Sequence, residues 1–138
     1  MILRPPLVYG KDDVSMGYGP TGFTYKYVNG EKIILWGNGS EYREFIYIDD
    51  VGKIICRLIN NNFSGTLNLV SGKSYTYEDV LNKLKKITNS HTNIESRERS
   101  KDKVDHHYSN KLIQTILGDF RFTILEEGLY KTYRAIIN

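Results

Sequence analysis

Cysteine, proline and long apolar runs are scarce in this sequence. The chain has one cysteine and three prolines among 138 residues, so an internal disulfide is impossible and nothing indicates an oxidising compartment. No stretch approaches the roughly 20 apolar residues of a membrane-spanning helix, and the first residues lack the basic and apolar regions of a signal peptide. We therefore expect a cytoplasmic protein with no membrane partner.

The sequence also has no large excess of positive or negative charge. Nineteen lysines and arginines are interspersed with 16 aspartates and glutamates, which gives a net charge of +3. The basic residues form no stripe with interleaved aromatics, so no nucleic-acid partner is expected. With 40% apolar and 25% charged residues, the composition is typical of one globular domain or a part of one. The weak positive charge suits a small anionic ligand.

The apolar pattern predicts short strands that alternate with helices. Strands are expected at residues 2–4, 32–36, 44–48 and 66–70, and helices at 23–28, 50–59, 76–87, 110–117 and 125–137. Residues 95–105, which are mostly charged, are expected to form a loop. This alternation predicts an α/β fold. Pro5 and Pro6 end the first strand so early that we interpret it as the tail of an element cut from a larger fold.

Two further expectations concern the helix at residues 50–59. Asp49 or Asp50 is expected to cap its N-terminus rather than to act in catalysis. Cys56 is expected to be a small buried residue rather than a nucleophile, since no general base lies near it in sequence.

Two patterns suggest ligand sites but are better explained otherwise. Residues 17–22 spell G-x-G-x-x-G, yet no buried strand precedes them and no long helix is expected directly afterwards, so a loop is the preferred interpretation. His106 and His107, near Asp102 and Asp105, lack the spaced ligands of a metal site. We therefore predict no metal site and no cofactor-binding residue.

The most informative stretch is residues 37–51, where Arg43 lies between a glycine-rich turn and an apolar strand. A guanidinium presents its donors in a planar fork that matches two phosphate oxygens, and a rigid strand fixes its direction. The alternative is that Arg43 pairs with Glu41 or Glu44 at an exposed sheet edge. Trp36, just before the turn, is either a core residue or a flat platform for a base.

Four motifs occur in order along the chain. They are LRP at residues 3–5 with VYG at 8–10, LWGNG at 35–39 with REFIYIDDV at 43–51, LNLVSG at 67–72, and LG at 117–118 with LEEGL at 125–129. Together they resemble the carboxy-terminal half of extended short-chain dehydrogenase/reductases, in the branch of NAD-dependent nucleotide-sugar epimerases and dehydratases. The resemblance implies a partial Rossmann-type epimerase fold that lacks its dinucleotide-binding half. Residues 1–138 would form a single substrate-binding domain or a fragment of one.

The resemblance also implies substrate-binding residues. Arg43 matches an arginine that contacts the nucleotide diphosphate, and Leu35 and Trp36 match residues that line the slot for the base. Arg99 best fits a second arginine at the diphosphate, with Arg97 as a competitor. Tyr9 would face the ligand near the nicotinamide.

The cofactor of the resembled family is NAD(P), and its missing amino-terminal half supplies the glycine-rich turn, the catalytic tyrosine and the lysine. None of the 11 tyrosines here has a lysine four residues later, so no catalytic residue is predicted and these residues are not expected to turn over alone. The expected partners are a nucleotide-diphosphate sugar and, at an apolar sheet edge, a second copy or the missing half. The alternative is a non-catalytic nucleotide-sugar-binding or protein-interaction module.

Overall fold

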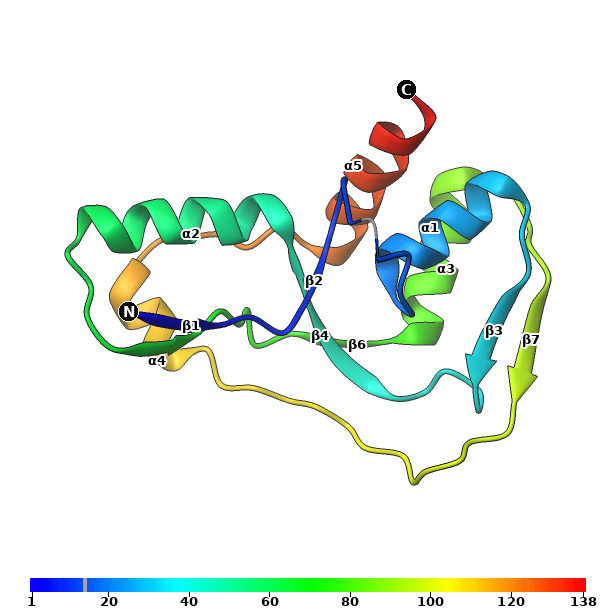
Figure 1. Ribbon diagram of the computed structural model, residues 1–138, viewed down its shortest axis with the longest axis horizontal. Coiled ribbons are helices and arrows are strands. Elements are labelled where there is room, and N and C mark those ends of the chain that lie inside the picture. Colours follow the sequence, from blue (N-terminus) through cyan, green and yellow to red (C-terminus); the bar gives the residue numbers. More distant parts are fainter. Residues whose placement is uncertain (14) are drawn as a thin grey trace.

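Strand β4 (Tyr42–Tyr47) crosses the middle of the molecule and joins two lobes (Figure 1). The computed structural model describes residues 1–13 and 15–138. Its other strands are β1 (Ile2–Arg4), β2 (Leu7–Tyr9), β3 (Ile33–Trp36), β5 (Thr66–Asn68), β6 (Ser74–Thr76) and β7 (Ile94–Arg97). Its helices are α1 (Pro20–Asn29), α2 (Ile48–Asn60), α3 (Tyr77–Thr88), α4 (Lys111–Leu117) and α5 (Leu125–Ile137). The alternation of strands and helices confirms the α/β fold.

The strands pair in three small sheets. Strands β1 and β5 are parallel, as are β3 and β7. Strand β4 lies between β2, to which it is parallel, and β6, to which it is antiparallel. Because β4 leads directly into α2, the middle sheet connects the lobe of α2 and α4 with the lobe of α1 and α3 (Figure 1).

Alternate side chains of β4 enter two different cores, because successive residues of a strand point to opposite faces. Phe45 and Tyr47 belong to the core beneath α1, α3 and α5, which we call the α5 core. Ile46 belongs to a second core, the α2 core, which also includes Ile54 and Leu58 of α2. Because alternate residues of β4 pack in the two cores, this strand connects the two lobes.

The helices with a clear apolar periodicity lie where the sequence predicts them. Helix α2 buries Ile54 and Leu58, and α3 buries Val80, Leu81 and Leu84. The N-terminus of α3 is closed by a capping box, in which Thr76 accepts from the Asp79 N–H while Asp79 accepts from the Thr76 N–H, both at 2.9 Å. Helix α5 has the expected bounds and packs against α1 and α3.

One expected boundary is wrong, and three short strands were not expected. Helix α1 begins at Pro20 rather than Phe23, because proline suits the first turn of a helix. Residues 95–97, expected to begin the loop at 95–105, belong to β7, which is exposed throughout and exists through its pairing with β3. Strands β2 and β6 were not expected either, since three residues are too few to show a period.

Two expectations for α2 are wrong. The helix begins after Tyr47 and has no side-chain cap. Asp50 instead accepts hydrogen bonds from Thr123, so its carboxylate holds a distant segment rather than the end of its own helix. Cys56 is exposed, not buried, because it lies on the outer face of α2.

Candidate functional site

A cavity of about 410 Å³ lies where the turn after β3, the start of α3 and the segment around residue 100 meet. We call it the Arg43 cavity. It is lined by Tyr18, Trp36, Glu41, Arg43, Tyr77, Arg99, Ser100, Lys101, Asp102 and Val104. Three of the five residues singled out from the sequence, Trp36, Arg43 and Arg99, therefore share one cavity.

Arg43 is partly buried and is held by the backbone, not by a carboxylate. Its Nη1 donates to the Tyr42 carbonyl at 2.8 Å and to the Val104 carbonyl. Glu44, the next residue along β4, points to the opposite face of the strand and accepts from the Ser71 and Gly72 N–H groups. The exposed pairs proposed from the sequence, Arg43 with Glu41 or Glu44, are therefore not formed.

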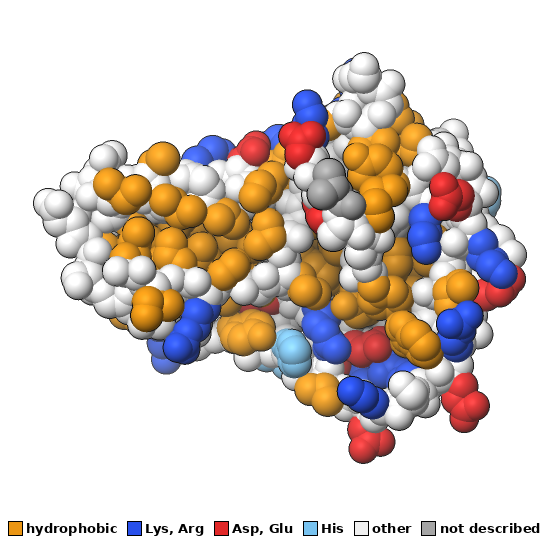
Figure 2. All heavy atoms as spheres, in the orientation of Figure 1, with side chains coloured by type: hydrophobic (Ala, Val, Ile, Leu, Met, Phe, Trp, Pro, Cys, Tyr) orange, Lys and Arg blue, Asp and Glu red, His pale blue; other side chains and the backbone are white. Residues whose placement is uncertain are grey.

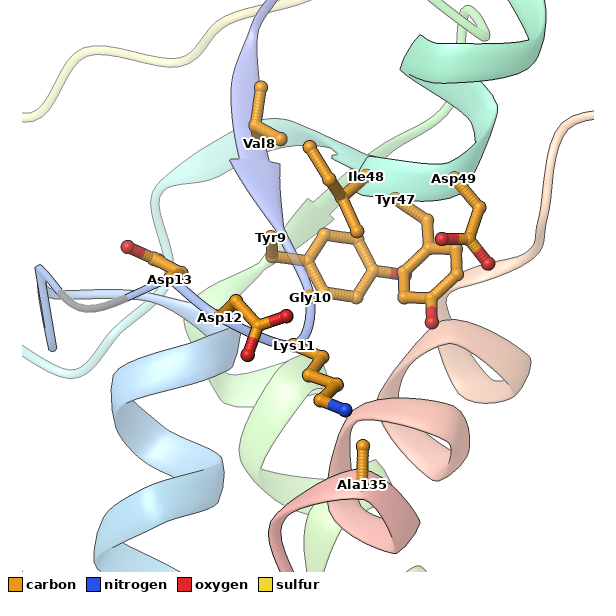
Figure 3. Close-up of a pocket in the computed structure, with 10 residues that line it drawn as sticks. All are labelled: Val8, Tyr9, Gly10, Lys11, Asp12, Asp13, Tyr47, Ile48, Asp49 and Ala135. Atoms are coloured by element: carbon orange, nitrogen blue, oxygen red, sulfur yellow. The ribbon is translucent and has the colours of Figure 1, made fainter.

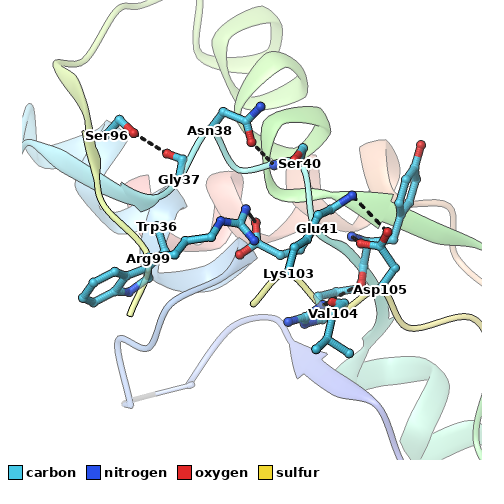
Figure 4. Close-up of polar contacts among 12 residues, drawn as sticks. Trp36, Gly37, Asn38, Ser40, Glu41, Ser96, Arg99, Lys103, Val104 and Asp105 are labelled. Atoms are coloured by element: carbon cyan, nitrogen blue, oxygen red, sulfur yellow. Dashed lines mark hydrogen bonds and ion pairs between the residues drawn. The ribbon is translucent and has the colours of Figure 1, made fainter. Parts of the chain in front are cut away.

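Glu41 pairs with Arg99 instead. Arg99 Nη2 lies 2.7 Å from Glu41 Oε2, and the two side chains are 20% and 9% exposed. That carboxylate oxygen is buried and accepts no well-directed hydrogen bond, so the contact is an ion pair. The Arg99 side chain runs beneath the turn, where a Cβ on Gly37 would lie 2.2 Å from its Nε (Figure 4). The bare backbone of Gly37, at φ +61°, thus lets this arginine enter the cavity.

Trp36 lies at the rim of the Arg43 cavity and is 40% exposed, so it is not a core residue. Arg97 stands over its ring, with the guanidinium carbon 5.5 Å from the centroid. Arg97 does not line the cavity. Leu35 is only 5% exposed and packs in the α5 core, to which the cavity residue Tyr77 also belongs.

Two tyrosines in the Arg43 cavity were missed by the sequence analysis. The Tyr18 and Tyr77 rings meet edge to face with their centroids 4.5 Å apart. Burial raises the pKa of Tyr77 to about 12, and the nearby Arg43 guanidinium opposes the rise. Tyr18 lies inside the G-x-G-x-x-G pattern, which was interpreted as a loop, and Tyr77 lies in the first turn of α3, so neither was singled out as a site residue.

Tyr9 lies elsewhere. It lines a second cavity of about 680 Å³ with Tyr47 and Asp49, and in Figure 3 Lys11 points from the loop after β2 toward α5. The Tyr9 side chain is 2% exposed, and its buried hydroxyl has no hydrogen-bond partner among the described residues. Tyr9 and the two arginines, Arg43 and Arg99, thus line different cavities.

The G-x-G-x-x-G segment does not fit a dinucleotide phosphate. Helix α1 begins within the pattern, at Pro20, rather than after it at residue 23 as expected. A Cβ on Gly22 would lie 2.0 Å from the Gly17 carbonyl oxygen, so the segment packs against its own helix. Strand β2 ends at Tyr9, far ahead of the pattern. The segment thus differs from the usual dinucleotide fingerprint, which directly follows a buried strand.

Two further features, a metal site and a membrane-spanning helix, are absent from the described residues. Within residues 1–13 and 15–138, no three His, Cys, Asp or Glu side chains gather closely enough to hold a metal ion. None of the described helices has the length and apolar character needed to cross a membrane.

Comparison with known proteins decides the family. The model of the NAD dependent epimerase/dehydratase family matches residues 1–70, about half of the chain. The chain belongs to this family. Residues 1–70 include Leu35, Trp36 and Arg43, so the turn and strand that build one side of the Arg43 cavity lie within the matched part.

Curated relatives of this family member are much longer than it is. UDP-glucuronic acid decarboxylase 1 of Danio rerio is 26% identical over 113 residues, which cover 81% of this chain and 27% of the relative. GDP-L-fucose synthase 1 of Arabidopsis thaliana is 33% identical over 63 residues, 44% of this chain and 19% of the relative. The chain thus spans about a quarter or less of these relatives.

Solved structures show the same fold. The UDP-N-acetylglucosamine 4-epimerase of Methanobrevibacter ruminantium, in complex with UDP-N-acetylmuramic acid, matches 98% of this chain with a TM-score of 0.84 and 23% identity. The UDP-glucose 4-epimerase of Thermus thermophilus, in complex with NAD, matches 98% with a TM-score of 0.85 and 20% identity. In both, the match covers 45% of the solved chain.

Proposed function

We propose that this chain is the nucleotide-sugar-binding part of an NAD-dependent epimerase or dehydratase and that it binds its ligand in the Arg43 cavity. The observation that carries the proposal is the convergence of Arg43 and Arg99 on one cavity with the exposed face of Trp36 at its rim. At about 410 Å³, the cavity lies in the range of roughly 300–1,000 Å³ typical of small-molecule sites.

Each group has a role that its chemistry supports. Arg43 uses Nη1 for the backbone and also interacts with the Tyr77 hydroxyl, and its remaining N–H groups can donate to a phosphate. Arg99 is partly neutralised by Glu41, which keeps a second cation fixed without a large excess of positive charge. Trp36 offers a flat apolar surface to a base, with Leu35 beneath the slot in the core. A nucleoside diphosphate matches this combination of groups.

We propose further that these 138 residues bind without turnover. The resembled family performs its chemistry with NAD(P) and a Tyr-x-x-x-Lys pair, and this sequence contains no such pair. Tyr9 would then lie near the reacting end of the ligand only in the presence of further protein, because it is buried and apart from the two arginines.

A calorimetric panel tests the proposal. The chain is titrated with UDP-glucose, GDP-mannose and dTDP-glucose, and with uridine, guanosine and thymidine. We expect saturable binding of a sugar nucleotide with one kind of base and much weaker binding of the matching nucleoside, which has no phosphate. Equal affinity for the nucleoside would contradict the role of the arginines. Proton NMR of the ligand incubated with the chain and NAD is expected to show no conversion.

The exposed surface of the lobe that contains α2 and β1 is the basis for proposing a further protein partner. Apolar side chains gather over this lobe in Figure 2, and Ile2, Ile48 and Ile59 are 59%, 41% and 58% exposed. Within the described residues, β1 pairs only with β5, so its other edge is open. We propose that this surface is covered by the remainder of the family fold or by a second copy. A concentrated monomer that binds no hydrophobic dye, assayed by ultracentrifugation and fluorescence, would exclude such a surface.

A further inference from the structure

Tyr18 brings a phenol hydroxyl into the Arg43 cavity from the loop that precedes α1. The Trp36 backbone N–H donates to that oxygen at 3.1 Å, which fixes the hydroxyl beside the end of β3. The ring is held edge-on by Phe23 and Tyr77, at centroid distances of 5.1 and 4.5 Å. The hydroxyl therefore has a defined position at the cavity wall.

This hydroxyl is available as a donor. Its oxygen already accepts from Trp36, and its own proton goes to no acceptor among the described residues. Burial raises the pKa of Tyr18 and the Trp36 N–H opposes the rise, so the phenol keeps its proton at neutral pH. A protonated hydroxyl at a cavity wall, with no acceptor of its own, can donate a hydrogen bond to a ligand oxygen.

The surroundings of the hydroxyl indicate which ligand oxygen it meets. It contacts the backbone of Trp36, the residue proposed to hold the base. The charged groups that act on it are Glu41, Arg99 and Arg43, which line the same cavity, and the two arginines are the residues proposed to hold the diphosphate. In a nucleoside diphosphate, the ribose lies between the base and the phosphates.

We propose that Tyr18 donates a hydrogen bond to a ribose hydroxyl of the bound nucleotide and thereby selects ribonucleotides over their deoxy forms. The inference rests on the proposed function of the cavity. It assigns to the G-x-G-x-x-G segment a contact made by a side chain, whereas the usual role of such a segment is to offer backbone N–H groups to a phosphate. Selectivity follows because a site built around a ligand hydroxyl leaves its own polar group unpaired when that hydroxyl is absent.

The test combines one variant with three ligands. UDP and GDP are titrated first, and the nucleotide that binds is then compared with its 2′-deoxy and 3′-deoxy forms. We expect Tyr18→Phe to bind the ribonucleotide roughly 5- to 10-fold more weakly, the range for one neutral hydrogen bond. One of the deoxy forms is expected to show the same loss with the unmodified chain and no further loss with Tyr18→Phe.

Controls separate this inference from the proposed function. Tyr130→Phe, at a tyrosine that is 51% exposed on α5, is expected to bind like the unmodified chain. If none of the UDP-, GDP- and dTDP-sugars binds the unmodified chain, the proposed function itself fails, whereas binding of a dTDP-sugar alone overturns only the selection of ribonucleotides. If UDP or GDP binds and Tyr18→Phe either binds equally well or loses the same factor for all three nucleotides, only the ribose contact is overturned. The comparison of ligands on the unmodified chain needs no variant and is independent of any effect on folding.

Discussion

Asp50, in the first turn of α2, accepts two hydrogen bonds from Thr123, one from its backbone N–H at 2.6 Å and one from its hydroxyl at 2.9 Å. Asp50 is 1% exposed. It fastens the segment before α5 to the first turn of α2, close to the middle sheet. A buried carboxylate with two such donors is a stabilising contact, not a helix cap.

The Asp50 contact predicts a large loss of stability on truncation. Asp50→Ala leaves the Thr123 N–H without its partner and removes two charge-assisted hydrogen bonds, so the free energy of unfolding is expected to fall by about 2–4 kcal/mol. The matched control is Asp49→Ala, an exposed aspartate in the same helical turn, which is expected to cost less than about 1 kcal/mol. Urea denaturation of both variants measures the difference, and equal losses would show that Thr123 contributes nothing.

The close contact between Tyr9 and Gly128 predicts that substitutions at these two residues have coupled effects on stability. A Cβ on Gly128 would lie 2.0 Å from the Tyr9 hydroxyl oxygen and 2.7 Å from the ring carbon that carries it. Gly128→Ala is therefore expected to destabilise the chain by roughly 1–3 kcal/mol through overpacking. Because the Tyr9 hydroxyl has no partner among the described residues, Tyr9→Phe alone is expected to be nearly neutral. In the double variant it is expected to recover part, but not all, of the loss.

A thermodynamic cycle of thermal melts tests this coupling. The pair is expected to be non-additive by more than about 0.5 kcal/mol, as for residues in direct contact. Additive changes would mean that the backbone of α5 moves away from β2 without involving the hydroxyl.

The buried carboxyl of Glu44 predicts that the stability of the folded chain falls as pH rises above about 4.5. Burial raises the pKa of this carboxyl above its ordinary value of 4.5, while the N–H groups of Ser71 and Gly72 oppose the rise. Between the unfolded value and the raised folded value, the folded chain binds more protons than the unfolded chain, so its stability falls as pH increases through that window. Glu44→Gln removes this titration.

Urea denaturation at a series of pH values compares the two proteins. From pH 4.5 upward, the unmodified chain is expected to lose stability relative to Glu44→Gln until the folded carboxyl has ionised, after which the difference becomes constant. A difference that grows in the opposite direction over this window would show that the two N–H donors outweigh burial.

Helices α2, α3 and α5 were predictable because each is long enough to repeat its apolar residues at helical spacing. Strand β7 was not, since two of its four residues are charged and all four are exposed, and it forms only because β3 lies beside it. Glu44 and Asp50 show the same limit for polar residues. Their partners, Ser71 and Thr123, are far away in sequence, so local patterns suggested a sheet-edge ion pair and a helix cap instead.

For the candidate site, the resemblance to a family singled out Arg43, Trp36 and Arg99, which the structure brings to one cavity. It did not indicate the ion pair of Arg99 with Glu41, because that contact depends on how the segment after β7 passes beneath Gly37. Nor did it indicate Tyr18, whose side chain enters the cavity from a segment recognised only for its glycines.

The central claim, that Arg43 holds the diphosphate of a nucleotide sugar, is tested most directly by calorimetric titration of Arg43→Ala with UDP-, GDP- and dTDP-sugars. Arg134→Ala, which removes an exposed arginine of α5, is the matched control. We predict that the ligand bound by the unmodified chain is bound more weakly by about 1.5–3 kcal/mol in Arg43→Ala, the range for a charge-assisted contact, and equally well in Arg134→Ala. Unchanged affinity in Arg43→Ala, or equal losses in both variants, would contradict the account.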